Sequence, residues 1–183
     1  MSSIDWTTLP APQDDGATAH LIGASLPDLS LPSTSGGQVH LGSLKGTSVV
    51  YIYPMTATAE GAIPDGWDTI PGARGCTPQS CAFRDHFGDL QALGVSTVFG
   101  VSVQDTAYQR EAAERLHLPF PLLSDAAFRL QKALILPTFD DAGMPLLKRM
   151  TWVVEDAMIV KVFYLVFPPD RNAQDVLDWL AAR

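Results

Sequence analysis

The chain has 183 residues, a formal net charge of −8 and 46% hydrophobic residues, which suits one domain with a substantial core. The negative charge argues against nucleic acid or an anionic membrane as a partner, because both need a basic face. No apolar run reaches the ~18–20 residues that span a bilayer, and the first residues lack the pattern of a secretory signal. We therefore expect a cytoplasmic protein.

The N-terminal part predicts an arm and then a hairpin. Residues 1–25 are rich in Pro, Ala, Thr and Asp without a clear period, so we interpret them as an arm before a domain at 26–183. Residues 29–31 and 39–41 flank a turn-rich stretch with two glycines, which predicts a β-hairpin. Residues 49–53 form a continuous β-branched and aromatic run, typical of a strand covered on both faces.

A long irregular segment separates this strand from the next helix. The strand ends at Pro54, and residues 55–70 contain three Gly or Pro residues and no period. A loop of that length in a compact domain is usually a functional lid or a disordered insertion. After Cys76 the apolar residues 83, 87 and 90 share one helical face, and Gly94 is expected to end this helix.

The second half alternates strands and helices before closing with a hairpin. We predict a strand at 97–103, a helix capped by Asp105, an extended stretch at 119–123, a helix from Asp125 to about 135, strands at 150–154 and 158–167, and a last helix capped by Asn172. The run 163–167 suits an edge strand at a dimer interface or a central strand equally well. This order predicts an α/β fold with a mixed sheet flanked by helices.

The two cysteines, Cys76 and Cys81, carry the clearest chemical signal. Cys76 opens a predicted helix, where free backbone N–H groups and the helix dipole favour a thiolate. Cys81, five residues later, is placed to react with whatever Cys76 becomes. In a reducing compartment such a pair is more often catalytic or metal-binding than structural.

Two plainer interpretations of the cysteines are weaker. A zinc site needs two more ligands, and the four histidines at 20, 40, 86 and 117 show no ligand spacing. A pair of inert buried thiols does not suit the polar, turn-like surroundings of Cys76. We expect thiol redox chemistry without a metal or other cofactor.

The segment around the cysteines resembles a known family. The run Gly75-Cys-Thr-Pro-Gln-Ser-Cys-Ala-Phe-Arg-Asp85 is similar to the Gly-Cys-Thr-x-x-x-Cys-x-Phe-Arg-Asp motif of the peroxiredoxin Q, or bacterioferritin comigratory protein, group. Tyr53-Pro54, the run 118–125 and Arg149 before the last hairpin match the same family in the same order. The resemblance covers about residues 26–180 and implies a thioredoxin-like fold.

The resemblance also implies roles. Cys76 would be the peroxidatic cysteine, Cys81 the resolving cysteine and Arg149 the active-site arginine, with Arg74 a weaker candidate for stabilising charge. The implied function is reduction of hydrogen peroxide and organic hydroperoxides, with a thioredoxin- or glutaredoxin-type dithiol as reductant. A monomer or homodimer is expected. The alternatives are a thiol–disulfide oxidoreductase, disfavoured by four residues between the cysteines, and a redox sensor.

One departure concerns the peroxide pocket. The family places a proline, a hydroxyl residue and the cysteine in one tight loop, Pro-x-x-x-Thr/Ser-x-x-Cys. Here Pro54 lies 22 residues before Cys76, and Ala73 occupies the position three before it. By the resemblance, Pro54, Thr56 and Thr58 are the candidate substrate-binding residues, and Thr69 is a further source of the hydroxyl.

Helix geometry adds an inference about the catalytic cycle. Residues five apart on a helix are roughly 8–9 Å apart at Cα, whereas a disulfide tolerates at most about 7 Å. Cys76 and Cys81 therefore cannot join while their helix is intact, and we predict that its first turns unwind in each cycle.

Overall fold

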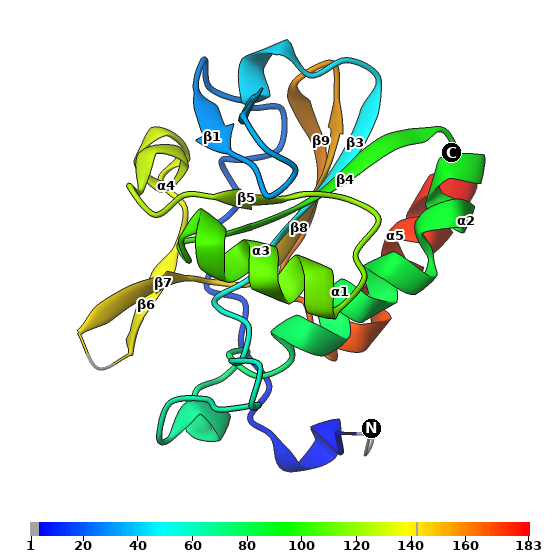
Figure 1. Cartoon of the computed structure of the whole chain (residues 1–183). Coiled ribbons are helices and arrows are strands. Elements are labelled where there is room, and N and C mark those ends of the chain that lie inside the picture. Colours follow the sequence, from blue (N-terminus) through cyan, green and yellow to red (C-terminus); the bar gives the residue numbers. More distant parts are fainter. Residues whose placement is uncertain (1–3, 142) are drawn as a thin grey trace.

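The computed structural model describes residues 4–141 and 143–183. Its centre is a mixed five-stranded sheet (Figure 1) in the order β5 (Leu122–Ser124), β4 (Val95–Ser102), β3 (Thr47–Ile52), β8 (Met150–Glu155) and β9 (Met158–Phe163). Strand β3 pairs parallel with β4 and antiparallel with β8. The predicted strands are present, and β9 is an edge strand.

The described residues form five α-helices around the sheet: α1 (Cys76–Asp85), α2 (Phe87–Ala92), α3 (Thr106–Arg115), α4 (Arg129–Leu134) and α5 (Asn172–Ala181). Short 3-10 helices occupy Trp6–Thr8, Leu41–Ser43, Trp67–Thr69 and Pro169–Arg171. Two hairpins complete the fold, β1 (Ser30–Pro32) with β2 (Gln38–His40) and β6 (Thr138–Asp141) with β7 (Met144–Leu147). The first of these is the hairpin that the sequence predicts.

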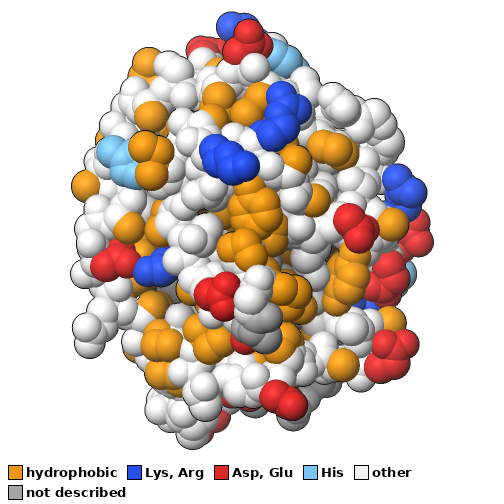
Figure 2. All heavy atoms as spheres, turned by 90° about the vertical axis from the view of Figure 1, so that its left-hand side faces the viewer, with side chains coloured by type: hydrophobic (Ala, Val, Ile, Leu, Met, Phe, Trp, Pro, Cys, Tyr) orange, Lys and Arg blue, Asp and Glu red, His pale blue; other side chains and the backbone are white. Residues whose placement is uncertain are grey.

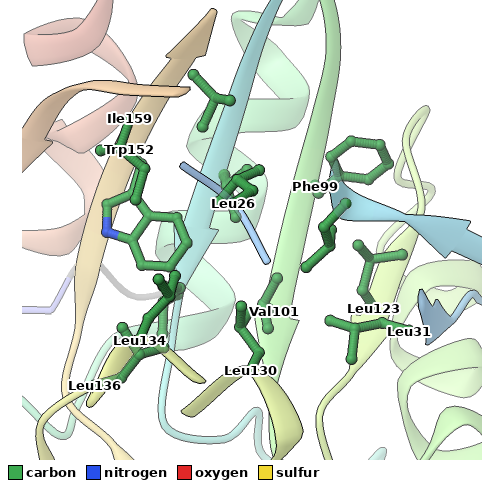
Figure 3. Packing of buried hydrophobic residues seen from close by; sticks show 14 of the residues in the cluster. Leu26, Leu31, Phe99, Val101, Leu123, Leu130, Leu134, Leu136, Trp152 and Ile159 are labelled. Carbon is green, nitrogen blue, oxygen red and sulfur yellow. The ribbon is translucent and has the colours of Figure 1, made fainter. Parts of the chain in front are cut away.

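Successive side chains of β3 pack alternately into two separate hydrophobic cores. Val50 and Ile52 belong to the cluster in Figure 3, which packs the sheet against the N-terminal hairpin and α4. Its labelled members are Leu26, Leu31, Phe99, Val101, Leu123, Leu130, Leu134, Leu136, Trp152 and Ile159. Val49 and Tyr51 face the other side, where α1, α2 and α5 bury their apolar residues. Because both faces are covered, β3 is apolar along most of its length, as its sequence indicates.

The structure corrects three expectations and adds one hairpin. The helix predicted from Cys76 to Gly94 is two helices, because the backbone turns out of helical geometry at His86 (φ −98°, ψ 9°). The strand predicted to run to residue 167 ends at Phe163. Asn172 is not a helix cap: its side chain is buried and accepts hydrogen bonds from the side chains of Gln79 and Thr151. The β6–β7 hairpin was not predicted.

The predicted cap of α3 is confirmed, whereas Asp125 is not the N-cap of α4, whose N-cap is Phe128. The Asp105 carboxylate accepts a hydrogen bond from the Tyr108 amide at 2.8 Å, as an N-cap does. Asp125 acts from further away, since α4 begins at Arg129 while both carboxylate oxygens accept from the Leu130 and Gln131 amides. The boundary between an N-terminal arm at residues 1–25 and a domain at residues 26–183 stays a prediction.

The face shown in Figure 2 carries basic, acidic and hydrophobic side chains together. Figure 2 shows the side that carries α4 and the β6–β7 hairpin, where Lys and Arg side chains stand among acidic and hydrophobic ones and form no continuous basic band. In the described ranges, every helix is too short or too polar to cross a bilayer.

Candidate active site

Cys76 is the first residue of α1 and is almost fully buried, with 3% of its surface exposed. The preceding Gly75 has φ 107°, a conformation that side chains rarely adopt. A Cβ at Gly75 would also lie 2.7 Å from Pro169 Cγ and 2.8 Å from Trp6 Cη2. Glycine is therefore required for the chain to enter the helix at this point and to place the thiol inside the protein.

Arg149 is the basic group at the thiol. It directly precedes β8, is 5% exposed, and its Nη2 atom donates a hydrogen bond to Cys76 Sγ at 3.1 Å. The same guanidinium donates to the carbonyls of Ala73 at 3.0 Å and Gly72 at 3.3 Å. Arg149 thus fixes the turn before α1 and holds a permanent positive charge where it stabilises negative charge on the sulfur.

A buried polar network holds Arg149 from the opposite side. Gln79 Oε1 accepts a hydrogen bond from Arg149 Nη1, and Gln79 Nε2 donates to Asn172 Oδ1 at 2.9 Å. Thr151 Oγ1 donates to the same Asn172 oxygen at 2.6 Å. All three polar residues are at most 1% exposed, so each hydrogen bond is costly to lose.

This network was not predicted from the sequence. Gln79 follows Cys76 by three positions and therefore shares its helical face, which is the one signal that the sequence offered. Asn172 was interpreted as a cap, and Thr151 as part of an apolar strand. Their contact depends on α5 crossing α1 and β8, which no local pattern specifies.

Aromatic packing supports the underside of α1. The Tyr51 ring stacks on Phe83 with centroids 4.8 Å apart, and its hydroxyl donates to Ser80 Oγ at 3.1 Å. Burial raises the pKa of Tyr51 well above its ordinary value, so this hydroxyl remains protonated at neutral pH. It serves as a fixed hydrogen-bond donor under the helix.

Cys81 lies on the same helix and is half-buried, and neither thiol is in a disulfide. Burial raises the pKa of Cys81, with the nearby Arg84 guanidinium opposing the shift. Both cysteines lie within the intact α1, so the five-residue spacing holds them too far apart to bond in this conformation.

A pocket of about 540 Å³ opens beside the two thiols. Four parts of the chain form it: the N-terminal arm, the 55–70 segment, the start of α1 with the two residues before it, and the 3-10 helix Pro169–Arg171. Its lining consists of Ile4, Trp6, Met55, Ala57, Gly61, Ile63, Trp67, Arg74, Gly75, Cys76, Thr77, Pro78, Cys81 and Asp170. The two cysteines therefore share one cavity with the long segment that the sequence singles out.

The candidate hydroxyl residues do not line this pocket. Met55 and Ala57 line the pocket, whereas Thr56 faces away: its hydroxyl donates to Gln104 Oε1 at 3.2 Å. The Thr58 hydroxyl accepts from the Ala62 amide at 3.1 Å.

Thr69 and Pro54 do not line the pocket either. The Thr69 hydroxyl donates to the Gly66 carbonyl at 2.6 Å, and Pro54 is buried outside the pocket lining. Within residues 4–141 and 143–183, no threonine hydroxyl donates to Cys76 Sγ. The Cys76 thiol instead donates to the Ala73 carbonyl at 3.7 Å.

Arg74 and Arg84, which the sequence places beside the cysteines, are both paired. Arg74 lines the pocket and pairs with Asp68 at 3.0 Å. Arg84 pairs with Asp85 at 2.8 Å and donates to the Leu116 carbonyl. Arg149 is therefore the arginine that contacts the Cys76 thiol. Three or more metal-ligating side chains do not gather anywhere in the part of the chain that the structure describes.

Comparison with known proteins identifies the family. The Redoxin family model matches residues 21–177. The chain is 30% identical over 176 residues to a chloroplastic peroxiredoxin Q of Triticum aestivum, covering 92% of this chain and 73% of that protein. It is 32% identical over 162 residues to the peroxiredoxin Q of Arabidopsis thaliana, covering 87% and 67%. The chain belongs to the peroxiredoxin Q group.

Solved structures agree on the fold. The peroxidoxin BcpB of Mycobacterium tuberculosis superposes with a TM-score of 0.69 at 25% identity, covering 88% of this chain and 96% of that one. A Xanthomonas campestris peroxiredoxin Q gives a TM-score of 0.67 at 20% identity, covering 96% and 98%. The fold is thioredoxin-like, and membership of the peroxiredoxin Q group makes the chain an oxidoreductase of the peroxidase class. The plant relatives are named as chloroplastic.

Proposed function

We propose that this peroxiredoxin reduces hydrogen peroxide and organic hydroperoxides with Cys76 as the peroxidatic and Cys81 as the resolving cysteine. The observation that carries the proposal is the Arg149 guanidinium 3.1 Å from the buried Cys76 sulfur. A permanent cation there stabilises the thiolate before reaction and the leaving oxygen during it. Cys81, in the same pocket, is the second thiol.

In the first step the Cys76 thiolate attacks the terminal oxygen of R–O–O–H. An S–O bond forms and the O–O bond breaks, which leaves Cys76 as a sulfenic acid and releases an alkoxide that takes a proton to become the alcohol. Arg149 and the free amide N–H groups of the first turn of α1 would stabilise the negative charge on the leaving oxygen. With hydrogen peroxide the product is water.

In the second step the Cys81 thiolate attacks the sulfenic sulfur. An S–S bond forms and hydroxide leaves as water after taking a proton. Because α1 keeps the two cysteines apart, its first turns must unwind before this bond forms. A thioredoxin- or glutaredoxin-type dithiol then returns two electrons and restores both thiols.

The test is steady-state peroxide consumption with two reductant systems, thioredoxin with its reductase and NADPH, and glutaredoxin with glutathione. Wild-type protein is expected to turn over with at least one system, while Cys76→Ser loses all activity. Cys81→Ser is the matched control, because it keeps the first chemical step and loses only disulfide formation. Peroxide consumption no faster than that of free cysteine, combined with rapid reduction of protein disulfides, would instead identify a disulfide exchanger.

Two further parts of the proposal concern the setting of the enzyme. A cytoplasmic location stays a prediction, to be tested by fractionation of cells that express the protein. A monomer or homodimer is likewise proposed, and sedimentation equilibrium distinguishes the two.

A further inference from the structure

The pocket beside Cys76 is built largely from segments outside the helices and the central sheet. The N-terminal arm contributes Ile4 and Trp6, and the 55–70 segment contributes Met55, Ile63 and Trp67 among others. Figure 1 places the first 3-10 helix and the segment around residue 67 at the same end of the molecule, near the start of α1. Two separate parts of the chain thus converge on one thiol and give it mainly apolar walls.

Trp6 is held in a defined position on this wall. Its indole Nε1 donates to Asp170 Oδ2 at 2.8 Å, and its ring packs edge-on against Phe167 with centroids 6.1 Å apart. Its Cη2 atom approaches Gly75 so closely that a side chain there would collide with it. Because the polar atom of Trp6 is satisfied by Asp170, the ring offers an apolar surface directly before Cys76.

The wall formed by the 55–70 segment is anchored in a small core of its own. Trp67 is 2% exposed, and its ring lies 6.0 Å from that of Phe139 in the β6–β7 hairpin. Leu146 joins the same cluster, and Ile63 packs against it while still lining the pocket. The segment is therefore a fixed wall of the cavity.

The size and charge of the pocket indicate what it accommodates. An apolar cavity of about 150 Å³ is enough for a benzene molecule, and this pocket measures about 540 Å³. Hydrogen peroxide, little larger than water, would fill only a small part of this volume. Of the charged residues in the lining, Arg74 pairs with Asp68 and Asp170 accepts the Trp6 indole N–H. Most of the remaining lining is apolar, which favours an uncharged apolar group.

We propose that Trp6 determines specificity by forming, opposite Ile63, an apolar subsite for the bulky organic group of a hydroperoxide. This inference rests on the proposed peroxidase function and adds a substrate preference to it. The organic group lies between the arm and the 55–70 segment while the O–O bond reaches Cys76 and Arg149. Hydrogen peroxide has no organic group and gains nothing from this subsite.

The test compares kcat/KM for cumene hydroperoxide and hydrogen peroxide in wild type and Trp6→Ala. Loss of a few apolar contacts in a hydrophobic pocket lowers kcat/KM by about tenfold or more. We therefore expect a loss of that size for cumene hydroperoxide and a change below about twofold for hydrogen peroxide. Trp179→Ala is the matched control. Trp179 lies on α5, packs against Phe163 of β9 and does not line the pocket. Its loss should leave the ratio of kcat/KM for the two substrates unchanged.

A second variant keeps the inference testable if Trp6→Ala fails to fold. Ala57→Phe fills the pocket from the other segment, and it too is expected to impair cumene hydroperoxide selectively. Equal losses for both substrates, or no loss for either, would overturn the inference while leaving the peroxidase function intact. Wild-type protein that reduces neither substrate would instead overturn the proposed function.

Discussion

The Gln79→Leu substitution tests how the buried network supports catalysis. It keeps a side chain of similar size but removes the acceptor for Arg149 Nη1 and the donor to Asn172. A hydrogen bond to a charged group contributes about 1.5–3 kcal/mol. If the transition state loses that much stabilisation because the Arg149 guanidinium is no longer held in place, the second-order rate constant of Cys76 oxidation falls by about ten- to 150-fold. This follows because 1.36 kcal/mol corresponds to a factor of ten.

The assay is stopped-flow tryptophan fluorescence of reduced protein mixed with peroxide. Gln109→Leu is the matched control: Gln109 is equally buried, but its amide donates to Ser102 and the Leu123 carbonyl on the far strands. Both variants should lose about 1–3 kcal/mol of stability, and only Gln79→Leu should lose the reaction rate. Gln79→Glu, which retains an acceptor for Arg149, should recover part of the rate. Equal rates in the two leucine variants would refute a positioning role for Gln79.

Three further results are expected. Gly75→Ala should lower stability by about 1–3 kcal/mol in thermal unfolding because of its positive φ and the collision with Pro169, whereas Gly88→Ala, which meets open space in α2, should not destabilise the protein. Because burial raises the pKa of Cys81, less of it is thiolate at neutral pH, so the disulfide-forming phase should accelerate from pH 7 to 9; a flat profile contradicts this. Hydrogen exchange at residues 76–84 should be faster in the oxidised protein, and equal protection in both states would rule out unwinding of α1.

The sheet could be predicted because its strands carry strong local patterns. The run before Pro54 is apolar on both faces, and β3 is indeed covered on both sides. The β6–β7 hairpin escaped detection because its sequence contains acidic residues and Pro145 rather than alternating apolar ones. Its Phe139 and Leu146 instead pack against Trp67 of the long 55–70 segment, a contact between distant parts of the chain.

At the site, the two cysteines and Arg149 could be predicted, whereas the buried residues that hold Arg149 in place could not. The resemblance to the family predicted roles for Cys76, Cys81 and Arg149, and Arg149 does contact the Cys76 sulfur. The hydroxyl could not be assigned, because the 55–70 segment changes which residues face the thiol: Met55 and Ala57 do, whereas Thr56 turns toward Gln104. The contribution of Trp6 depends on an arm that folds back across the molecule to Asp170.

The central claim is that Cys76 attacks the peroxide and Cys81 completes the disulfide. The most direct measurement is stopped-flow oxidation by hydrogen peroxide of wild type, Cys76→Ser and Cys81→Ser, with mass spectrometry of the products. The account predicts a rapid bimolecular phase that is lost in Cys76→Ser, and a Cys81→Ser protein that stops at a sulfenic acid on Cys76. Rapid oxidation that survives in Cys76→Ser would contradict it.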